Sequence, residues 1–155
     1  MRPAASDPVR VRPAIAADVD AVARVTRAAY VIHVPAIGRE PAPMAADHAG
    51  LVAAGDVHVA ELDGGVVGVL VIRPAGRALM LESVAVDPPA QGRGVGRALI
   101  GWAERHAQAA GLEAVELYTN AAMTGNVALY LRLGYRMVGR RTEDGYDRVF
   151  FRKEL

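Results

Sequence analysis

The chain has 155 residues, of which 18 are lysine or arginine and 17 are aspartate or glutamate, and its formal net charge at pH 7 is +1. This length fits one domain with a substantial core, and we expect residues 1–155 to form a single domain with residues 1–8 as a disordered lead-in. The even mixture of charges argues against nucleic acid as the main partner. The absence of cysteine excludes a disulfide, a thiol nucleophile and a cysteine metal site.

No segment of the sequence is typical of a membrane span or a secretory signal. The longest apolar stretch, Val66 to Ile72, is interrupted by Gly68 and is far shorter than the ~20 residues that cross a bilayer. Residues 1–9 (MRPAASDPV) lack the apolar core of a secretory signal. We therefore expect a soluble, cytoplasmic protein with no membrane partner.

The first half of the chain predicts a strand, two helices and three more strands. Residues 9–13 alternate as in a strand, and apolar residues at helical spacing follow Asp18 up to about Tyr30. Prolines make residues 33–47 an irregular connection, with a short helix only from about Met44 to Ala54. The three strands that follow, joined in tight hairpins by the turn sequences DGG and PAGR, are Val57–Leu62, Val66–Arg73 and Leu79–Val86.

The second half predicts two helices and three strands. A helix begins near Gly94 and stops at Gly111, and His106 falls on its apolar face, which predicts a core histidine. The remaining elements are a strand at Ala114–Thr119, a short helix at Thr124–Leu133, and two strands at Tyr135–Arg140 and Asp147–Lys153. The changing hydrophobic period is typical of a mixed α/β (α+β) domain, here in the order β-α-α-β-β-β-α-β-α-β-β.

The loop QGRGVG, Gln91 to Gly96, lies between the strand that ends at Val86 and the helix that begins near Gly94. The N–H groups in the first turn of a helix have no acceptor within that helix, and glycines let an anion approach them, so this position suits a phosphate group. A P-loop would need lysine and then serine or threonine after the last glycine, where this chain has Arg97 and Ala98. The P-loop interpretation therefore fails.

Two other phosphate-binding patterns can be compared with this loop. A dinucleotide-binding GxGxxG counted from Gly92 would need glycine where Arg97 stands, and it belongs near the start of a parallel βαβ unit. The pattern Gln/Arg-x-x-Gly-x-Gly/Ala, which clasps the pyrophosphate of coenzyme A, is satisfied by Gln91, Gly94 and Gly96. A glycine turn that only caps a helix is the alternative for so short a motif.

Two longer stretches and the element order extend this comparison. They are LESVAVDPPAQGRGVGRALI (Leu81–Ile100) and TGNVALYLRLGY (Thr124–Tyr135), followed by a final hairpin that turns at Asp144-Gly145. Together they make nearly the whole chain resemble the GNAT superfamily of acetyl-CoA-dependent N-acetyltransferases. The resemblance implies a single GNAT-like domain with a mixed central sheet of about seven strands and about four helices.

The resemblance also implies acetyl-CoA as co-substrate, with no metal, and indicates site residues by their positions in the motifs. Tyr130 matches the tyrosine general acid that protonates the departing thiolate, and Asn126 lies on the same helical face. Backbone groups of Val84 and Val86 match positions that pair with the pantetheine arm, with the Val84 N–H as the oxyanion donor. The residues expected to bind the cofactor are Val84, Ala85, Val86, Gln91, Gly92, Arg93, Gly94, Val95, Gly96, Arg97, Asn126 and Tyr130.

Glu82 is the expected general base, because members of this family often use a carboxylate on the same strand to take the ammonium proton through a water. An ordinary solvated glutamate on a strand is an equal interpretation. His33, His58 and His106 are alternative bases. No two histidines have the spacing of metal ligands.

The acceptor site is expected, again from the resemblance, where the segment from about Tyr30 to Met44 meets the last hairpin, Arg140 to Arg148. The residues expected to contact the acceptor are Tyr30, His33, Arg39, Glu82 and Tyr118. The acceptor is expected to be a small-molecule or peptide amine, and the sequence does not choose among small amines, amino acids, aminoglycosides and peptide N-termini. A homodimer is expected by analogy alone.

We expect the acetyl group to pass from acetyl-CoA to a primary amine by direct attack in a ternary complex, because a chain without cysteine lacks the commonest covalent acyl carrier. One alternative is an acyl-CoA-binding sensor or structural module, which would have no need of a thiolate acid such as Tyr130. A third hypothesis is a nucleotide-dependent enzyme that uses the glycine loop for ATP or NAD.

Overall fold

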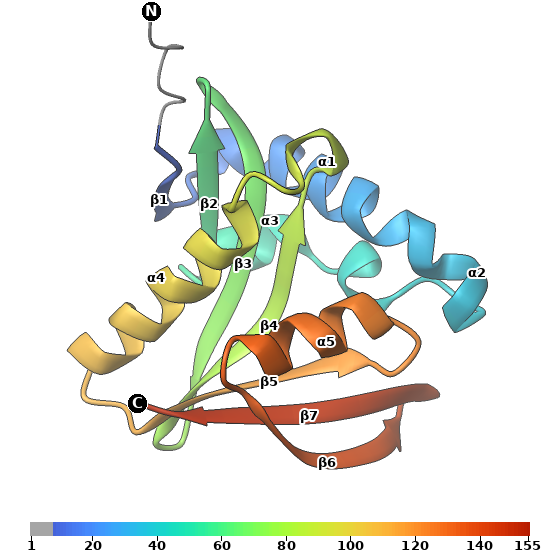
Figure 1. Cartoon of the computed structure of the whole chain (residues 1–155). Helices are drawn as coiled ribbons and strands as arrows, with labels where there is room; N and C mark the ends of the chain where they lie inside the picture. Colours follow the sequence, from blue (N-terminus) through green and yellow to red (C-terminus); the bar gives the residue numbers. More distant parts are fainter. Residues whose placement is uncertain (1–7) are drawn as a thin grey trace, which may run out of the picture.

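A seven-stranded sheet in the order β1-β2-β3-β4-β5-β7-β6 forms the centre of the computed structural model, which describes residues 8–155 (Figure 1). Its neighbouring strands are antiparallel, except that β4 and β5 run parallel. The elements are β1 (Arg10–Pro13), α1 (Val19–Tyr30), α2 (Val34–Ile37), α3 (His48–Ala53), β2 (Val57–Leu62), β3 (Gly65–Ala75), β4 (Ala78–Val86), α4 (Val95–Ala109), β5 (Ala114–Asn120), α5 (Thr124–Arg132), β6 (Arg136–Glu143) and β7 (Tyr146–Glu154). The expected lead-in, residues 1–8, lies outside the described residues except for Pro8.

The predicted mixed α/β class, the seven strands and the four helices α1, α3, α4 and α5 are confirmed, in the predicted order. The helix expected from Met44 begins only at His48, because the Asp47 side chain caps it by accepting a hydrogen bond of 3.0 Å from the Gly50 N–H. The connection before it contains a one-turn helix, α2, which ends at Gly38 in the left-handed conformation (φ 87°). Proline at the start of α2 is compatible with a first helical turn, so the prolines there shorten helical structure without abolishing it.

Two-residue turns close the hairpins β2–β3 and β6–β7. Asp63 and Gly64 have φ values of 53° and 82°, and Asp144 and Gly145 have φ values of 52° and 82°. Turns with two left-handed residues match the right-handed twist of the flanking strands, and Asp-Gly is a preferred sequence for them. These two turns fix the register of strands that carry residues near the hollows described below.

Helices cover both faces of the sheet, and each face has its own apolar core (Figure 1). On one face, α1 and α3 pack on β2 and β3 through residues such as Val22, Val25 and Val69. On the other, α4 packs through Leu99 and Ile100 in a cluster that extends to Phe151 of β7. The valine-rich strands are buried on both sides because neither face of the central sheet is left to solvent.

The strands β4 and β5 separate along their length, as Figure 1 shows. They pair only from Ala78–Leu81 with Ala114–Leu117, and beyond Leu81 no pairing continues. The register of β4 against β3 shifts at this same point, so that Glu82 is the extra residue of a β-bulge. Since a strand's backbone groups face its two neighbours alternately, part of the backbone of residues 82–86 faces the gap that opens between β4 and β5.

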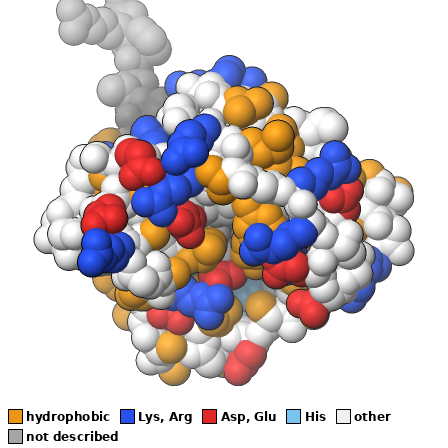
Figure 2. Space-filling model, turned by 90° about the horizontal axis from the view of Figure 1, so that it is seen from below, with side chains coloured by type: hydrophobic (Ala, Val, Ile, Leu, Met, Phe, Trp, Pro, Cys, Tyr) orange, Lys and Arg blue, Asp and Glu red, His pale blue; other side chains and the backbone are white. Residues whose placement is uncertain are grey.

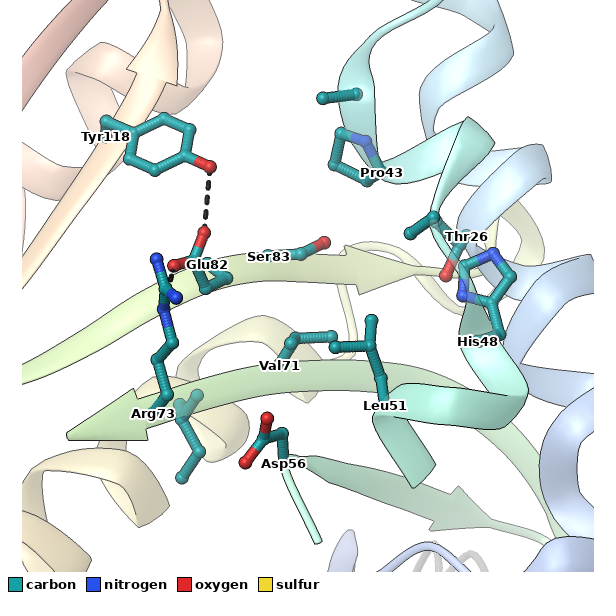
Figure 3. A pocket seen from close by; sticks show the side chains of 13 residues that line it. Thr26, Pro43, His48, Leu51, Asp56, Val71, Arg73, Glu82, Ser83 and Tyr118 are labelled. Carbon is teal, nitrogen blue, oxygen red and sulfur yellow. Dashed lines mark hydrogen bonds and ion pairs between the residues drawn. The ribbon is translucent and has the colours of Figure 1, made fainter. Parts of the chain in front are cut away.

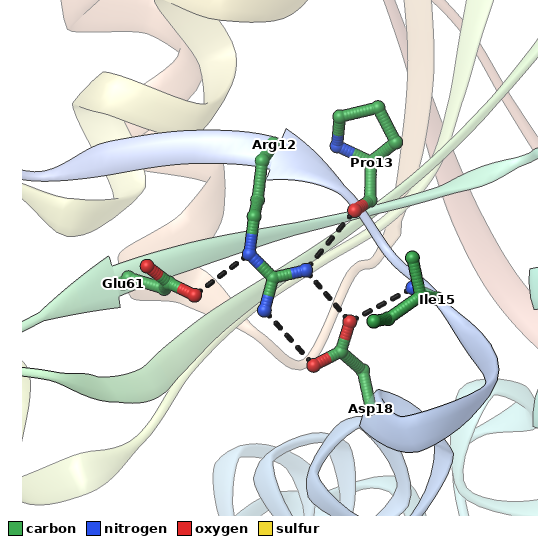
Figure 4. Close-up of polar contacts among 5 residues, drawn as sticks. All are labelled: Arg12, Pro13, Ile15, Asp18 and Glu61. Atoms are coloured by element: carbon green, nitrogen blue, oxygen red, sulfur yellow. Dashed lines mark hydrogen bonds and ion pairs between the residues drawn. The ribbon is translucent and has the colours of Figure 1, made fainter.

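The guanidinium of Arg12 on β1 connects the start of α1 to β2 (Figure 4). It donates to both carboxylate oxygens of Asp18, at 2.7 and 3.0 Å, and to Glu61 at 2.7 Å, while Asp18 also accepts from the Ile15 N–H. The hydrogen bonds from Arg12 outweigh burial and lower the pKa of the Asp18 carboxyl below its ordinary value. This network holds the beginning of α1, the helix that ends at Tyr30, against the edge of the sheet.

The expectation that His106 is a core histidine is wrong. His106 is exposed on α4 and stacks on Trp102 with the ring centroids 4.9 Å apart. His58 of β2 is the buried histidine here, with its ring 4.1 Å from that of Trp102, and burial lowers its pKa. The partly exposed Trp102 packs on both histidines, whose own ring centroids are 6.2 Å apart. Within residues 8–155 no helix has the length and apolar composition needed to cross a membrane.

Candidate active site

A cleft of about 550 Å³ lies where β4 and β5 diverge. The glycine loop and the start of α4 form one wall, and α5 forms the other. The cleft brings together most of the residues expected to bind the cofactor. Its lining includes Val84, Val86, Gln91, Gly92, Gly94, Val95, Gly96, Arg97, Asn126 and Tyr130, together with Tyr30 and His33.

The glycine loop presents free N–H groups to this cleft. Gly94 is the N-cap of α4, has no side chain to cap it, and takes the left-handed conformation at φ 82°, as Gly92 does at φ 81°. The first helical hydrogen bond runs from the Ala98 N–H to the Gly94 carbonyl at 3.0 Å, so the N–H groups of residues 95–97 have no acceptor within the helix. The positive end of a 15-residue helix therefore points at the cleft, with the Arg97 side chain beside it.

Two of the expected cofactor residues do not line the cleft. The Arg93 side chain turns away from it to form an ion pair of 3.1 Å with Asp63 in the β2–β3 turn. The Ala85 side chain is buried in the core under α1, because alternate residues of β4 point to opposite faces of the sheet. Any contact of Ala85 with a ligand is therefore limited to its backbone.

Tyr130 lies on α5, four residues after Asn126, and both side chains line the cleft. The Tyr130 ring is packed among aromatic side chains, with its centroid 5.9 Å from those of both Tyr135 and Phe151. Burial raises the pKa of the Tyr130 phenol above its ordinary value, with a smaller contribution from Tyr30. The hydroxyl therefore stays protonated at neutral pH, as an ordinary phenol does.

Glu82 lies at the bulge of β4 and is held by two donors (Figure 3). Its carboxylate accepts from Arg73 at 2.5 Å and from the Tyr118 hydroxyl at 2.9 Å. Burial, and then the charge of Glu82, raise the pKa of Tyr118 to about 12, so the phenol remains a donor. The Glu82 side chain is 20% exposed and forms an ion pair with the largely exposed Arg73, which is compatible with both interpretations, the general base and the ordinary surface glutamate.

A hollow of about 300 Å³ adjoins Glu82 on the side of α3. Apolar side chains form much of it, including Pro43, Leu51 and Val71 (Figure 3). Polar side chains reach it from several elements, among them Thr26, His48, Asp56 and Arg73. The face of the molecule in Figure 2 shows basic and acidic side chains interspersed, with hydrophobic side chains in a hollow between them. The sequence analysis missed these polar residues, because their positions in helical and strand patterns predict only ordinary surface or core residues.

A smaller hollow of about 50 Å³ shares lining residues with both the 300 Å³ hollow and the cleft. Glu82 and Tyr118 line both hollows, and Tyr30 lines the smaller hollow and the cleft. Residues from the two segments expected to build the acceptor site meet here, namely Pro41, Ala42 and Pro43 from one and Tyr146 and Arg148 from the other. Tyr30 therefore borders both the cleft and the smaller hollow that Glu82 lines.

Tyr30, at the end of α1, lines both the cleft and the smaller hollow. Its hydroxyl lies 3.2 Å from Ser83 Oγ and donates to the Val84 carbonyl at 3.3 Å. Burial raises the pKa of this phenol. The hydrogen bond from Tyr30 therefore occupies the Val84 carbonyl, and Val84 also lines the cleft.

The remaining expected residues lie apart from Glu82. Arg39 lies over the Tyr146 ring at 4.1 Å and donates to the Asp144 carbonyl at 2.8 Å, so it joins the connection before α3 to the last hairpin. His33 lines the cleft between the glycine loop and α5. His58 and His106, the other alternative bases, pack on Trp102 and line none of the three hollows.

Comparison with known proteins agrees with this geometry. The profile of the Acetyltransferase (GNAT) family matches residues 26–135, a range that includes the glycine loop and α5. A mycothiol acetyltransferase of Propionibacterium freudenreichii is 34% identical over 147 residues, covering 83% of this chain and 43% of that protein. An aminoalkylphosphonate N-acetyltransferase of Salmonella typhimurium is 39% identical over 56 residues, 36% of each chain.

Among solved structures, the PaiA N-acetyltransferase of Thermoplasma acidophilum, in complex with coenzyme A, superposes with a TM-score of 0.79. The alignment covers 96% of this chain and 100% of that one at 14% identity, so it shows a shared fold. The chain spans less than half the length of the mycothiol acetyltransferase it matches over 147 residues. The family profile nevertheless covers more than half of this chain, and the chain belongs to the acetyltransferase (GNAT) family.

Proposed function

We propose that this chain transfers the acetyl group of acetyl-CoA to a primary amine, by direct attack within a ternary complex. The observation that carries the proposal is the cleft at the divergence of β4 and β5, where the free N–H groups of α4 and the hydroxyl-bearing Tyr130 line one space. The free N–H groups are suited to bind a pyrophosphate, and the Tyr130 hydroxyl is suited to protonate the sulfur that leaves a thioester.

The chain's residues supply each function that acyl transfer to an amine requires. The loop from Gln91 to Gly96 and the start of α4 bind phosphate groups through backbone N–H groups. The Val84 N–H, on the part of β4 that has lost its β5 neighbour, donates to the oxygen that becomes negative. The Tyr130 phenol, which is protonated at neutral pH and lines the cleft, gives its proton to the leaving thiolate.

Glu82 is proposed as the base that takes the proton of the attacking ammonium through a water. It lines both hollows on the acceptor side, and Arg73 and Tyr118 hold its carboxylate in one position. A positioned carboxylate has the geometry that general base catalysis needs. Asn126 and Arg97 are proposed to contact the cofactor from the two walls of the cleft.

Thermal unfolding in the presence of acetyl-CoA, CoA, ATP or NAD tests which of these molecules the chain binds. Ligands that bind the native state stabilise it, so a CoA species at 100 times its dissociation constant is expected to raise Tm by about 5 °C or more. Gly94→Trp is expected to abolish the shift by blocking the loop. Gly111→Trp is the matched control, because Gly111 also has positive φ and open space around it but lies at the opposite end of α4.

The outcomes separate the three hypotheses. A shift with ATP or NAD and none with CoA species would favour the nucleotide-dependent enzyme. A shift with acetyl-CoA in both wild type and Gly94→Trp would contradict the assigned loop. A CoA-selective shift with no acetylation of any amine would favour the sensor or structural module.

Initial-rate kinetics tests the ternary complex. With acetyl-CoA and an amine varied together, double-reciprocal plots are expected to intersect, because both reactants must be bound before transfer. The chain has no cysteine to carry an acetyl group between two half-reactions. Parallel lines would instead indicate a covalent acetyl-enzyme and would contradict direct attack.

A further inference from the structure

Arg148 of β7 is a largely buried cation with unused donors. Its side chain is only 12% exposed, and it lines the small hollow that adjoins Glu82. Within residues 8–155 its guanidinium makes no hydrogen bond, and the carboxylate paired with it, Glu143, lies 3.8 Å away and already accepts from Arg141 at 2.7 Å. Within the described part of the chain, no nitrogen of Arg148 is both buried and unpartnered, so water in the hollow reaches its donors. The Arg148 donors are therefore available to a ligand in the hollow.

Aromatic rings hold this guanidinium in place. It lies 4.5 Å from the ring centroid of Tyr118 and 5.3 Å from that of Tyr146. Both rings are themselves anchored, since Tyr118 donates to Glu82 at 2.9 Å and Tyr146 donates to the Glu40 carbonyl at 2.5 Å. A guanidinium held over aromatic faces keeps its planar donor edge free for bidentate binding.

The hollow presents opposite charges on its two sides. The Tyr118 side chain spans them, because its hydroxyl is bonded to Glu82 while its ring lies beside Arg148. Asn120 is the cross-strand partner of Arg148 and lines the same hollow. Its Oδ1 accepts from the Ala122 N–H at 2.9 Å, which leaves its amide NH₂ group for a ligand.

We infer that the acceptor is a zwitterion: a primary amine that carries an anionic group, either a carboxylate or a phosphonate, a few bonds away. The anion binds the Arg148 guanidinium and the Asn120 amide, and the amino group faces Glu82. Carboxylates and phosphonates both match the two parallel donors of a guanidinium. This inference rests on the proposed acetyl transfer and narrows its acceptor, since a polycationic amine would bring positive charge against Arg148.

Matched amines test the inference by their kcat/KM values, measured as CoA released from acetyl-CoA. One pair, leucine and leucinamide, differs in the anion and has an apolar side chain suited to the larger hollow. Because the carboxylate also raises the pKa of the amino group, the rates are referred to the concentration of neutral amine. A second set, β-alanine, β-alaninamide and 2-aminoethylphosphonate, distinguishes carboxylate from phosphonate. In wild type, the better anionic amine is expected to exceed its neutral amide by about 10- to 100-fold, the range typical of hydrogen bonds to a charged group.

Variants then assign that preference to one side chain. Arg148→Gln is expected to bring the ratio between anionic and neutral amines close to one, and Arg148→Lys, which keeps the charge without the planar fork, is expected to give an intermediate ratio. Arg141→Gln is the matched control, because Arg141 also lies over an aromatic ring, that of Phe150, and contacts Glu143, yet is exposed on β6. It is expected to retain the wild-type ratio.

The ratio of kcat/KM values between anionic and neutral amines in the wild type tests the inference even where a variant does not fold. Amides acetylated as well as the anionic amines would overturn the inference and leave the proposed function standing. Acetylation of none of the anionic amines, with acetyl-CoA binding intact, would also overturn it. Equal losses toward anionic and neutral amines in Arg148→Gln would reduce Arg148 to a structural role. Failure of acetyl-CoA to bind would remove the proposed function and the inference with it.

Discussion

Replacement of Tyr130 by phenylalanine is expected to lower kcat by about 100-fold or more, with little change in the affinity for acetyl-CoA. The phenol lines the cleft and is protonated at neutral pH, so its hydroxyl has a proton to give. Removing one oxygen leaves the packed ring in place among Tyr135 and Phe151. Steady-state rates combined with a binding titration of acetyl-CoA measure the two effects separately.

Tyr135→Phe is the matched control for this variant. Tyr135 is also buried in the same aromatic cluster, but its hydroxyl donates to Glu104 of α4 at 3.1 Å and does not line the cleft. Its replacement is expected to reduce the free energy of unfolding by about 1 kcal/mol and to leave kcat unchanged. An unaltered kcat in Tyr130→Phe would instead support the sensor or structural module.

Gly68→Val is expected to lower the free energy of unfolding by about 2–3 kcal/mol. A Cβ atom at Gly68 of β3 would lie 2.8 Å from Val95 Cγ1 and 3.0 Å from both Ala60 Cβ and Leu99 Cδ1. The sheet, or the start of α4, must move to make room. Val95 is the first residue of α4, and the N-terminus of α4 lines the cleft proposed to bind acetyl-CoA. The affinity for acetyl-CoA is therefore expected to fall as well.

Gly65→Val on the same strand provides the control. Gly65 is exposed and has nothing within 4 Å of its Cβ position, so the change is expected to stay within about 0.5 kcal/mol. Urea unfolding of both variants with and without acetyl-CoA measures stability and binding together. Equal stabilities for the two variants would contradict the close approach of α4 to β3.

Short-range patterns predicted most of the fold. The Asp-Gly turns, the helical spacing after Asp18 and the glycines that end α4 and α5 each depend on a few neighbouring residues, and all appear where expected. The errors have local causes too. The side chain of Asp47 sets the start of α3, which a pattern of apolar residues does not reveal. The burial of His106 was predicted wrongly because helical spacing shows which residues share one face of α4. It does not show how far the surface packed against that face extends.

The residues that line the cleft were predictable because they follow one another along the chain, in the loop before α4 and on one face of α5. The polar residues that line the two hollows beside Glu82 were not predictable in this way. Arg148 meets Glu82 only through Tyr118, and the three residues lie on different strands. Arg73 and His48 reach the same region from β3 and α3. Each of these positions, taken alone, fits an ordinary surface residue.

The sequence by itself therefore determined the family resemblance, the order of the elements and the glycine loop, because all three are written in residues close together along the chain. Only the tertiary structure decided which side chains line the two hollows beside Glu82. The bulge at Glu82 and the loss of β4–β5 pairing beyond Leu81 open the gap between the strands. Pairing of β7 with β5 then places Arg148 opposite Asn120 at the edge of that gap. These contacts join residues distant in the sequence, and packing and strand register bring them together.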